Sequence, residues 1–283
     1  MKIIATPSRT KEILDKFDLF AKKNYGQNFL VEPGIVSKIA KHAVVSDHTL
    51  AIEIGPGIGA LTQMLAQEAK KVVAFEIDER LPEVLEYSLE ECDNVEVILK
   101  DFLEVDLKEF VSQYPDYDVV VAANLPYYIT TPILFKIFES NADIKRITVM
   151  MQKEVADRFS ATVNSKDYNA LSVITQYRAT VKQVVKVPRN VFNPKPNVDS
   201  SVLQFEFKEK DNTVNEELFF EMVKACFKQR RKTILNNFGD WVKDKDKARM
   251  YLEEADIDVQ RRAESCTCEE FMKLYRRIEN ETI

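Results

Sequence analysis

The stretch Leu50-Ala-Ile-Glu-Ile-Gly-Pro-Gly-Ile-Gly59 joins a short apolar run to a glycine turn. The apolar run has the length of a buried strand, and Ala60-Leu-Thr-Gln-Met-Leu-Ala66 after the turn has the spacing of a helix. The three glycines alternate at positions 55, 57 and 59, as required where the backbone approaches a ligand and side chains would clash. The segment therefore predicts a strand, a tight turn and a helix that form a ligand-binding corner.

Short apolar runs and helical patterns alternate on both sides of this corner. Strands are predicted at 72–76, 95–99, 118–123 and 146–151, and helices at 8–20, 33–42, 81–89 and 132–138. Such an alternation is typical of a mostly parallel sheet that is covered on both faces. Two later β runs, 180–187 and 201–208, predict an antiparallel pair at one edge of this sheet. The predicted fold class is α/β and Rossmann-like.

The C-terminal quarter of the chain has a different pattern. Residues 208–216 are polar and are interpreted as a linker, after which helices are predicted at 218–227, 231–238, 247–254 and 269–278. The expected organisation is a catalytic domain over residues 1–208, with an N-terminal helical extension at 8–42, and a small all-helical domain over residues 209–283.

Charge and composition restrict the class of protein. The 46 acidic residues exceed the 40 basic ones, and the net charge of −6 argues against a protein that coats nucleic acid indiscriminately. A local basic surface remains compatible with this average. The residues that suggest such a surface, as a candidate for binding nucleic acid, are Lys195, Lys228, Arg230, Arg231 and Lys232.

Metal binding and membrane insertion are not expected. The four cysteines are scattered except for Cys266 and Cys268, whose spacing is too tight for the usual zinc-ligand pair, and the chain has two histidines. No apolar run approaches the roughly 20 residues that cross a bilayer, and no signal peptide is visible. We expect a cytoplasmic protein without a metal site.

The glycine turn favours one cofactor class over another. Its G-x-G-x-G spacing differs from the G-x-G-x-x-G that seats a dinucleotide pyrophosphate on a helix N-terminus. Glu53, directly before the turn, would repel a pyrophosphate but suits a positively charged cofactor, such as a sulfonium with its amino-acid head. S-adenosylmethionine is the expected cofactor. A nicotinamide-dependent oxidoreductase is the alternative that both features oppose.

Two further strand ends carry candidate cofactor ligands. Glu76 ends the second predicted strand, where an acidic side chain can accept both hydroxyls of a ribose. Asp101-Phe102 follows the third strand and could offer a carboxylate to an adenine amino group beside an aromatic wall. Ligands gather at the carboxyl ends of such strands.

The segment Asn124-Leu125-Pro126-Tyr127-Tyr128 follows the fourth strand and carries the candidate chemistry. An exocyclic adenine amine is a poor nucleophile because its lone pair is delocalised into the ring. If the Asn124 side-chain oxygen and the Leu125 carbonyl accept its two N–H groups, the lone pair is freed to attack a methyl group. Pro126 shapes the turn, and Tyr127 offers a flat face for stacking. Catalysis would then rest on alignment and electrostatics.

Together these motifs resemble the bacterial small-subunit ribosomal RNA adenine dimethyltransferases, whose loss gives kasugamycin resistance. The resemblance covers about residues 10 to 280. It also rests on three segments outside the strand ends: Tyr25-Gly-Gln-Asn-Phe-Leu30, Phe192-Asn-Pro-Lys-Pro-Asn-Val-Asp-Ser200 and Phe227-Lys-Gln-Arg-Arg-Lys-Thr-Ile-Leu-Asn-Asn237.

The resemblance implies a fold, a reaction and a set of site residues. The fold would be a Rossmann-like class I S-adenosylmethionine methyltransferase domain, and the reaction the N6,N6-dimethylation of two adjacent adenines near the 3′ end of 16S rRNA during small-subunit biogenesis. The partner would be the small ribosomal subunit. Independently of the resemblance, a monomer is the default expectation. Phe192 would stack on the flipped adenine. The residues that line the cofactor site would be Asn28, Leu30, Gly55, Gly57, Glu76, Asp101, Phe102 and Asn124.

Two other functions remain open at this point. The related large-subunit methyltransferases that give macrolide resistance share fold, cofactor and target amine, but Leu125, Tyr128 and the Phe192 loop favour the small-subunit enzyme. The chain could instead act mainly as a ribosome-assembly checkpoint with methylation secondary, although the intact Asn124 motif favours working chemistry. Tyr25 departs from the family, where a smaller or basic residue is expected, and this affects the predicted Asn28 and Leu30 contacts.

Overall fold

The computed structural model describes residues 2–19, 28–126 and 128–279. Contacts divide the chain into two compact units, Met1–Ala156 with Lys182–Phe207, and Asp157–Val181 with Lys208–Ile283. The later boundary coincides with the predicted domain limit near residue 208. Residues 157–181, which the sequence pattern assigned to the first domain, group with the C-terminal residues because their contacts lie there.

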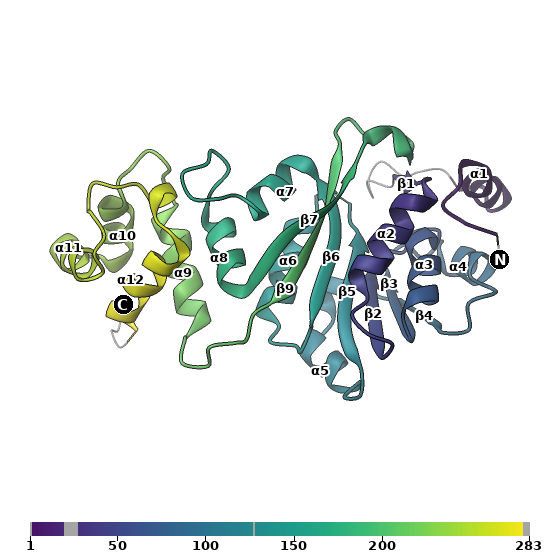
Figure 1. Ribbon diagram of the computed structural model, residues 1–283, viewed down its shortest axis with the longest axis horizontal. Coiled ribbons are helices and arrows are strands. Elements are labelled where there is room, and N and C mark those ends of the chain that lie inside the picture. The colour runs from purple at the N-terminus through teal and green to yellow at the C-terminus, as the bar shows by residue number, and fades with distance from the viewer. Residues whose placement is uncertain (1, 20–27, 127, 280–283) are drawn as a thin grey trace. The chain divides into compact units, whose positions relative to one another are not determined.

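The first unit is built on a seven-stranded sheet, with strand order β4-β3-β2-β5-β6-β9-β7 (Figure 1). The pairs β3–β4, β2–β3, β2–β5 and β5–β6 are parallel, whereas β9 is antiparallel to β6. The late pair β9 and β7 forms one edge, as the sequence predicts. The strands are β2 (Thr49–Ile54), β3 (Lys71–Glu76), β4 (Val95–Leu99), β5 (Asp118–Asn124), β6 (Arg146–Gln152), β7 (Ala179–Val187) and β9 (Ser200–Phe207).

Helices flank this sheet and start where the sequence supplies caps. Glu32 accepts a hydrogen bond from the Gly34 amide ahead of α2, whose first residue is Pro33. One core cluster joins α2 and α3 to β2, β3, β5, β6 and β9. The helices that begin in this unit are α1 (Pro7–Lys16), α2 (Pro33–Ala43), α3 (Ala60–Glu68), α4 (Pro82–Ser88), α5 (Leu107–Ser112), α6 (Thr130–Glu139) and α7 (Lys153–Phe159).

Within its described residues the second unit is helical apart from the start of β7. Its helices are α8 (Ala170–Arg178), α9 (Glu216–Cys226), α10 (Ile234–Val242), α11 (Lys245–Glu254) and α12 (Cys268–Ile278). The predicted start of α10 at residue 231 is wrong by three residues, because the Thr233 side chain accepts from the Asn236 amide and caps the helix there. The basic run 228–232 therefore lies between two helices. The predicted helix 8–20 likewise ends early, at Lys16, and its last residue is outside the described range.

Candidate active site

The carboxyl ends of β2, β3 and β5 and the residues after β4 border a cavity of about 180 Å³. These strands are neighbours in the order β4-β3-β2-β5. Tyr127 lies outside the described residues. The cavity wall contains every other residue that the sequence assigned to the cofactor or catalytic set: Asn28, Leu30, Gly55, Gly57, Glu76, Asp101, Phe102, Asn124, Leu125, Pro126 and Phe192.

The three glycines of the turn have left-handed φ angles of +68°, +59° and +90°, which side chains rarely adopt. They have different surroundings. A Cβ on Gly55 would meet nothing within 4 Å, whereas a Cβ on Gly59 would lie 3.1 Å from Leu89 Cδ2 and from Ser88 Oγ. Gly55 therefore leaves room at the cavity wall, and Gly59 allows α3 to pack closely against the end of α4.

Glu76 ties the turn to the end of β3. Its Oε1 accepts from the amides of Ile77 (2.8 Å) and Asp78 (2.9 Å), and its Oε2 accepts from Gly57 (3.3 Å). The side chain is 5% exposed, and this burial raises its pKa. An ionised carboxylate has about four acceptor positions, so Glu76 retains capacity for ligand hydroxyls.

Glu53 is the most buried acid of the cavity wall, with 1% exposure. Its Oε2 has no hydrogen-bond partner in the described part of the chain. Burial, together with the charge of Glu76, raises its pKa to about 8. A buried acceptor without a partner costs about 1–3 kcal/mol, so this wall fits a ligand that brings a donor or a positive charge. Glu53 was not among the predicted site residues, although its position directly before the glycine turn already favoured a positively charged cofactor.

Asp101 and Phe102 shape the wall beyond β4. Asp101 Oδ1 accepts from the Leu103 amide (2.8 Å) and so starts the short 3-10 helix Phe102–Glu104. The buried Phe102 ring contacts Phe75 edge to face at 5.6 Å between centroids. The aromatic wall that the sequence predicts is therefore present, held by core packing.

The loop after β5 turns directly into α6. The Pro126 carbonyl accepts from the Ile129 amide (3.2 Å) and from Thr130 Oγ1 (3.3 Å). This fixes the course of the backbone that carries Asn124 and the buried Leu125 at the cavity. Tyr128 also lines the cavity and is 62% exposed, although it was not among the predicted site residues.

Two segments far apart in sequence meet at the cavity as a two-stranded sheet. β1 (Phe29–Leu30) pairs antiparallel with β8 (Phe192–Asn193), and the Val31 amide donates to the Val191 carbonyl at 2.9 Å. Phe192 is 5% exposed and belongs to the core cluster that contains Leu30. The pairing brings the predicted cofactor contacts and the predicted stacking residue to one wall.

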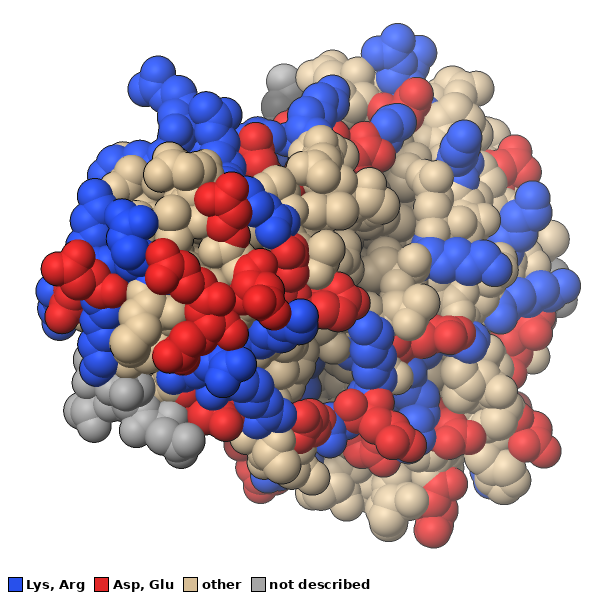
Figure 2. Space-filling view, turned by 60° about the vertical axis from the view of Figure 1, so that its left-hand side comes forward, with Lys and Arg blue, Asp and Glu red and all other residues tan. Residues whose placement is uncertain are grey.

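The residues predicted to contact RNA fall into both units. Lys195 belongs to the first unit, and the other four belong to the second. Arg230 pairs with Glu264 at 2.9 Å and also donates to the Lys166 carbonyl, while Lys232 lies 3.4 Å from Asp240. Figure 2 shows acidic side chains interspersed with basic ones on the face that it presents.

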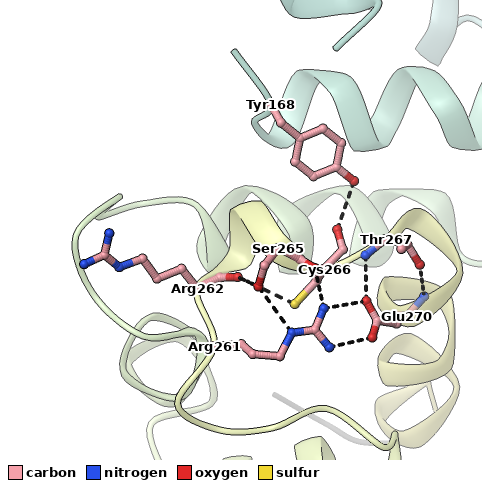
Figure 3. Close-up of polar contacts among 7 residues, drawn as sticks. All are labelled: Tyr168, Arg261, Arg262, Ser265, Cys266, Thr267 and Glu270. Atoms are coloured by element: carbon pink, nitrogen blue, oxygen red, sulfur yellow. Dashed lines mark hydrogen bonds and ion pairs between the residues drawn. The ribbon is translucent and has the colours of Figure 1, made fainter. Parts of the chain in front are cut away.

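A polar network braces the segment after α11 (Figure 3). Arg261 donates to both carboxylate oxygens of Glu270, at 2.6 and 2.9 Å, and to the Ser265 carbonyl. The Glu270 carboxylate also accepts from the Thr267 amide in the capping box of α12, and the Tyr168 hydroxyl donates to the Cys266 carbonyl at 3.0 Å. The Arg261 carbonyl accepts from Ile234 at the start of α10, directly after the basic run.

The described residues contain no cluster of three or more His, Cys, Asp or Glu side chains arranged to hold a metal ion. No helix among them is both long and apolar enough to span a membrane.

The strand order, the glycine turn and the acidic strand ends define a class I methyltransferase fold. Solved structures agree: a dimethyladenosine transferase from Plasmodium falciparum has a TM-score of 0.74 and 29% identity, covering 88% of this chain and 96% of that one. The 23S rRNA methyltransferase ErmE has a TM-score of 0.69 and 26% identity, covering 89% and 100%.

The family is shown by sequence as well. The model of the ribosomal RNA adenine dimethylase family matches residues 19–280, and the chain belongs to that family. Proteins named ribosomal RNA small subunit methyltransferase A are 49% identical in Bacillus pumilus, over 96% of both chains, and in Bacillus cytotoxicus, over 97% of both. The chain is thus an rRNA adenine dimethyltransferase.

Proposed function

We propose that this enzyme uses S-adenosylmethionine to dimethylate N6 of two adjacent adenines near the 3′ end of small-subunit rRNA during subunit biogenesis. The observation that carries the proposal is the convergence of Glu53, Glu76, Asp101 and Asn124 at one cavity. The choice of the small subunit is supported by the relatives that are 49% identical and carry that substrate in their names.

The cavity wall offers a group for each part of the cofactor. Glu76 would accept the ribose hydroxyls, Asp101 the adenine amino group, and Glu53 would face the positive charge of the methionine part. Asn28 and Leu30 would contact the methionine and ribose parts from β1 and the residue before it. When bound, S-adenosylmethionine supplies a methyl group on a sulfonium, which is transferred without a metal.

Asn124 at the end of β5 and Leu125 directly after it would activate the amine. The Asn124 side-chain oxygen and the Leu125 carbonyl would accept the two N6–H groups and direct the lone pair at the methyl carbon. The N–C bond would form as the C–S bond breaks, and the amine would then lose one proton to solvent. Phe192, with Tyr127 as the predicted opposite face, would hold the flipped base. Orientation of this kind can supply roughly 7–11 kcal/mol of barrier lowering.

The second unit is proposed to contact RNA through the segment between α9 and α10. Lys228 and Arg231 are exposed there, in a run that also holds Arg230 and Lys232. Phosphate contacts and shape would recognise the folded subunit. We further propose that the enzyme acts as a cytoplasmic monomer.

Transfer of labelled methyl to purified small subunits that lack the modification tests the proposal. Nuclease digestion should yield N6,N6-dimethyladenosine from small-subunit RNA, and Asn124→Ala should abolish the label while leaving subunit binding intact. Label in large-subunit RNA alone would identify a macrolide-resistance type of enzyme. Absence of label from both RNAs would refute the proposal.

A further inference from the structure

Three acidic side chains are buried where β2 and β3 meet the cavity: Glu53, Glu76 and Asp78. They differ in how their charge is stabilised. Asp78 forms an ion pair with Arg80, with contacts of 2.6 and 2.9 Å, and Glu76 accepts three backbone N–H groups. Glu53 has neither kind of support at Oε2 within the described residues.

The immediate surroundings of Glu53 are apolar or acidic. In the sheet it lies beside Ala74 of β3 and Ala122 of β5. The polar groups that act on Glu53 are the Thr62 side chain of α3 and the carboxylate of Glu76. The negative charge of Glu76 disfavours a negative charge on Glu53. An unpaired carboxylate in such a place binds a proton rather than remain charged.

We propose that Glu53 holds a proton while the cavity is empty and releases it to solvent when S-adenosylmethionine binds, so that Glu53 selects the cationic cofactor by proton exchange. The inference rests on the proposed cofactor. Binding would replace the neutral carboxyl by a carboxylate that faces a positive charge, with one O–H bond broken and the proton taken up by the buffer. Burial raises the pKa of Glu53 to about 8, so the group is mostly protonated at neutral pH.

Isothermal titration with S-adenosylmethionine, repeated in buffers of different ionisation enthalpy, counts the protons released. The wild-type enzyme should release close to one proton from Glu53 near pH 7. The difference in proton count between the wild type and Glu53→Gln should approach zero at about pH 9, because Glu53 is then already ionised. The affinity should rise with pH by up to about tenfold per unit below that pKa.

Glu53→Gln keeps the shape of the side chain and removes its titration. We expect this variant to release no more protons than the cofactor's own amino group accounts for, and to bind with an affinity that varies little between pH 6 and 8. Asp118→Asn is the matched control: it neutralises an acid at the opposite end of the same sheet, where Ser46 Oγ donates to it at 2.6 Å, and should keep the wild-type proton count.

The outcomes separate this inference from the proposed function. Binding of S-adenosylmethionine by the wild-type enzyme without proton release overturns the role of Glu53 and leaves the methyltransferase assignment intact. The same conclusion follows if Glu53→Gln releases as many protons as the wild type. Failure of the wild-type enzyme to bind S-adenosylmethionine refutes the proposed cofactor itself. The wild-type proton count does not depend on the stability of any variant.

Discussion

Gly55 and Gly59 belong to one sequence motif but face different surroundings, and alanine at each position should separate the two roles. Both substitutions place a side chain in a left-handed conformation, which costs about 1–2 kcal/mol. At Gly59 the new methyl would also press on Leu89 and Ser88 at 3.1 Å, adding about 1–3 kcal/mol. We expect Gly59→Ala to lower the free energy of unfolding more, as measured by urea denaturation.

The loss of cofactor affinity should be larger for Gly55→Ala than for Gly59→Ala, the opposite of their order in stability. At Gly55 the methyl would stand in open space at the cavity wall, where the cofactor is proposed to lie. Gly55→Ala should therefore weaken S-adenosylmethionine binding by about tenfold or more in isothermal titration, which corresponds to at least ~1.4 kcal/mol. Equal losses of affinity in the two variants would contradict the distinction.

Glu53 also makes the stability of the empty enzyme depend on pH. Its pKa is about 8 in the folded protein against an ordinary 4.5, so between these values the folded state binds a proton that the unfolded chain does not. The free energy of unfolding should then fall as pH rises through this window, by up to about 1.4 kcal/mol per pH unit, and Glu76 shifts in the same direction. Urea denaturation between pH 5 and 8 should show a shallower decline for Glu53→Gln. Parallel curves would contradict the assignment.

The clustering of the candidate residues could be predicted from sequence to a large extent, because the carboxyl ends of parallel strands meet at one edge of a sheet. Glu76 and Asn124 end apolar strands, Asp101 follows one, and all three line one cavity. The hydrogen-bonding state of Glu53 could not be predicted. It depends on Ala74 and Ala122 lying beside it, which requires the strand register.

At the scale of elements, strands were predicted more closely than helix ends. The strand at 95–99 matches its predicted bounds, because an apolar run and its flanking turns define a strand locally. The start of α10 depends on the Thr233 cap, and the pairing of β1 with β8 joins residues more than 160 positions apart. Hydrophobic periodicity is a local pattern and does not predict which distant segments pair.

The hydrogen bonds of Arg261 and Glu270 connect the starts of α10 and α12 in the second unit. Arg261→Ala would remove the two-pronged contact between Arg261 and Glu270, whose side chains are 28% and 24% exposed. Because solvent partly screens this ion pair, we expect the free energy of unfolding to fall by about 1–3 kcal/mol. Arg261→Lys should fall between the wild type and Arg261→Ala, because an ammonium cannot make the planar two-pronged contact. Urea denaturation measures both.

Hydrogen exchange would locate the effect of these variants. The Ile234 amide donates to the Arg261 carbonyl at 2.7 Å, and the Thr267 amide donates to Glu270. Loss of the Arg261 side chain should speed exchange at the starts of α10 and α12 before it affects the sheet of the first unit. Uniform acceleration across both units would show that the network has no local role.

For the whole molecule, the net charge is −6, so RNA binding depends on local basic side chains that are not paired with acidic ones. Within the basic run, Arg230 is paired with Glu264, and Lys232 lies near Asp240. Lys228 and Arg231 are exposed and are the proposed phosphate ligands. Replacing both by alanine should weaken binding to small subunits and reduce the slope of log affinity against log salt by about 1–2.

Arg230→Ala is the informative comparison, because it removes the same charge from the same segment. If Arg230 serves to hold the segment against Glu264 and the Lys166 carbonyl, its loss should lower the free energy of unfolding by about 0.5–1 kcal/mol, as for a largely exposed pair, and leave the salt slope nearly unchanged. A slope that falls by about 1 in Arg230→Ala but not in the double variant would reverse the assignment. It would mean that the ion pair between Arg230 and Glu264 breaks when the enzyme binds the ribosome, and that Arg230 then contacts an RNA phosphate.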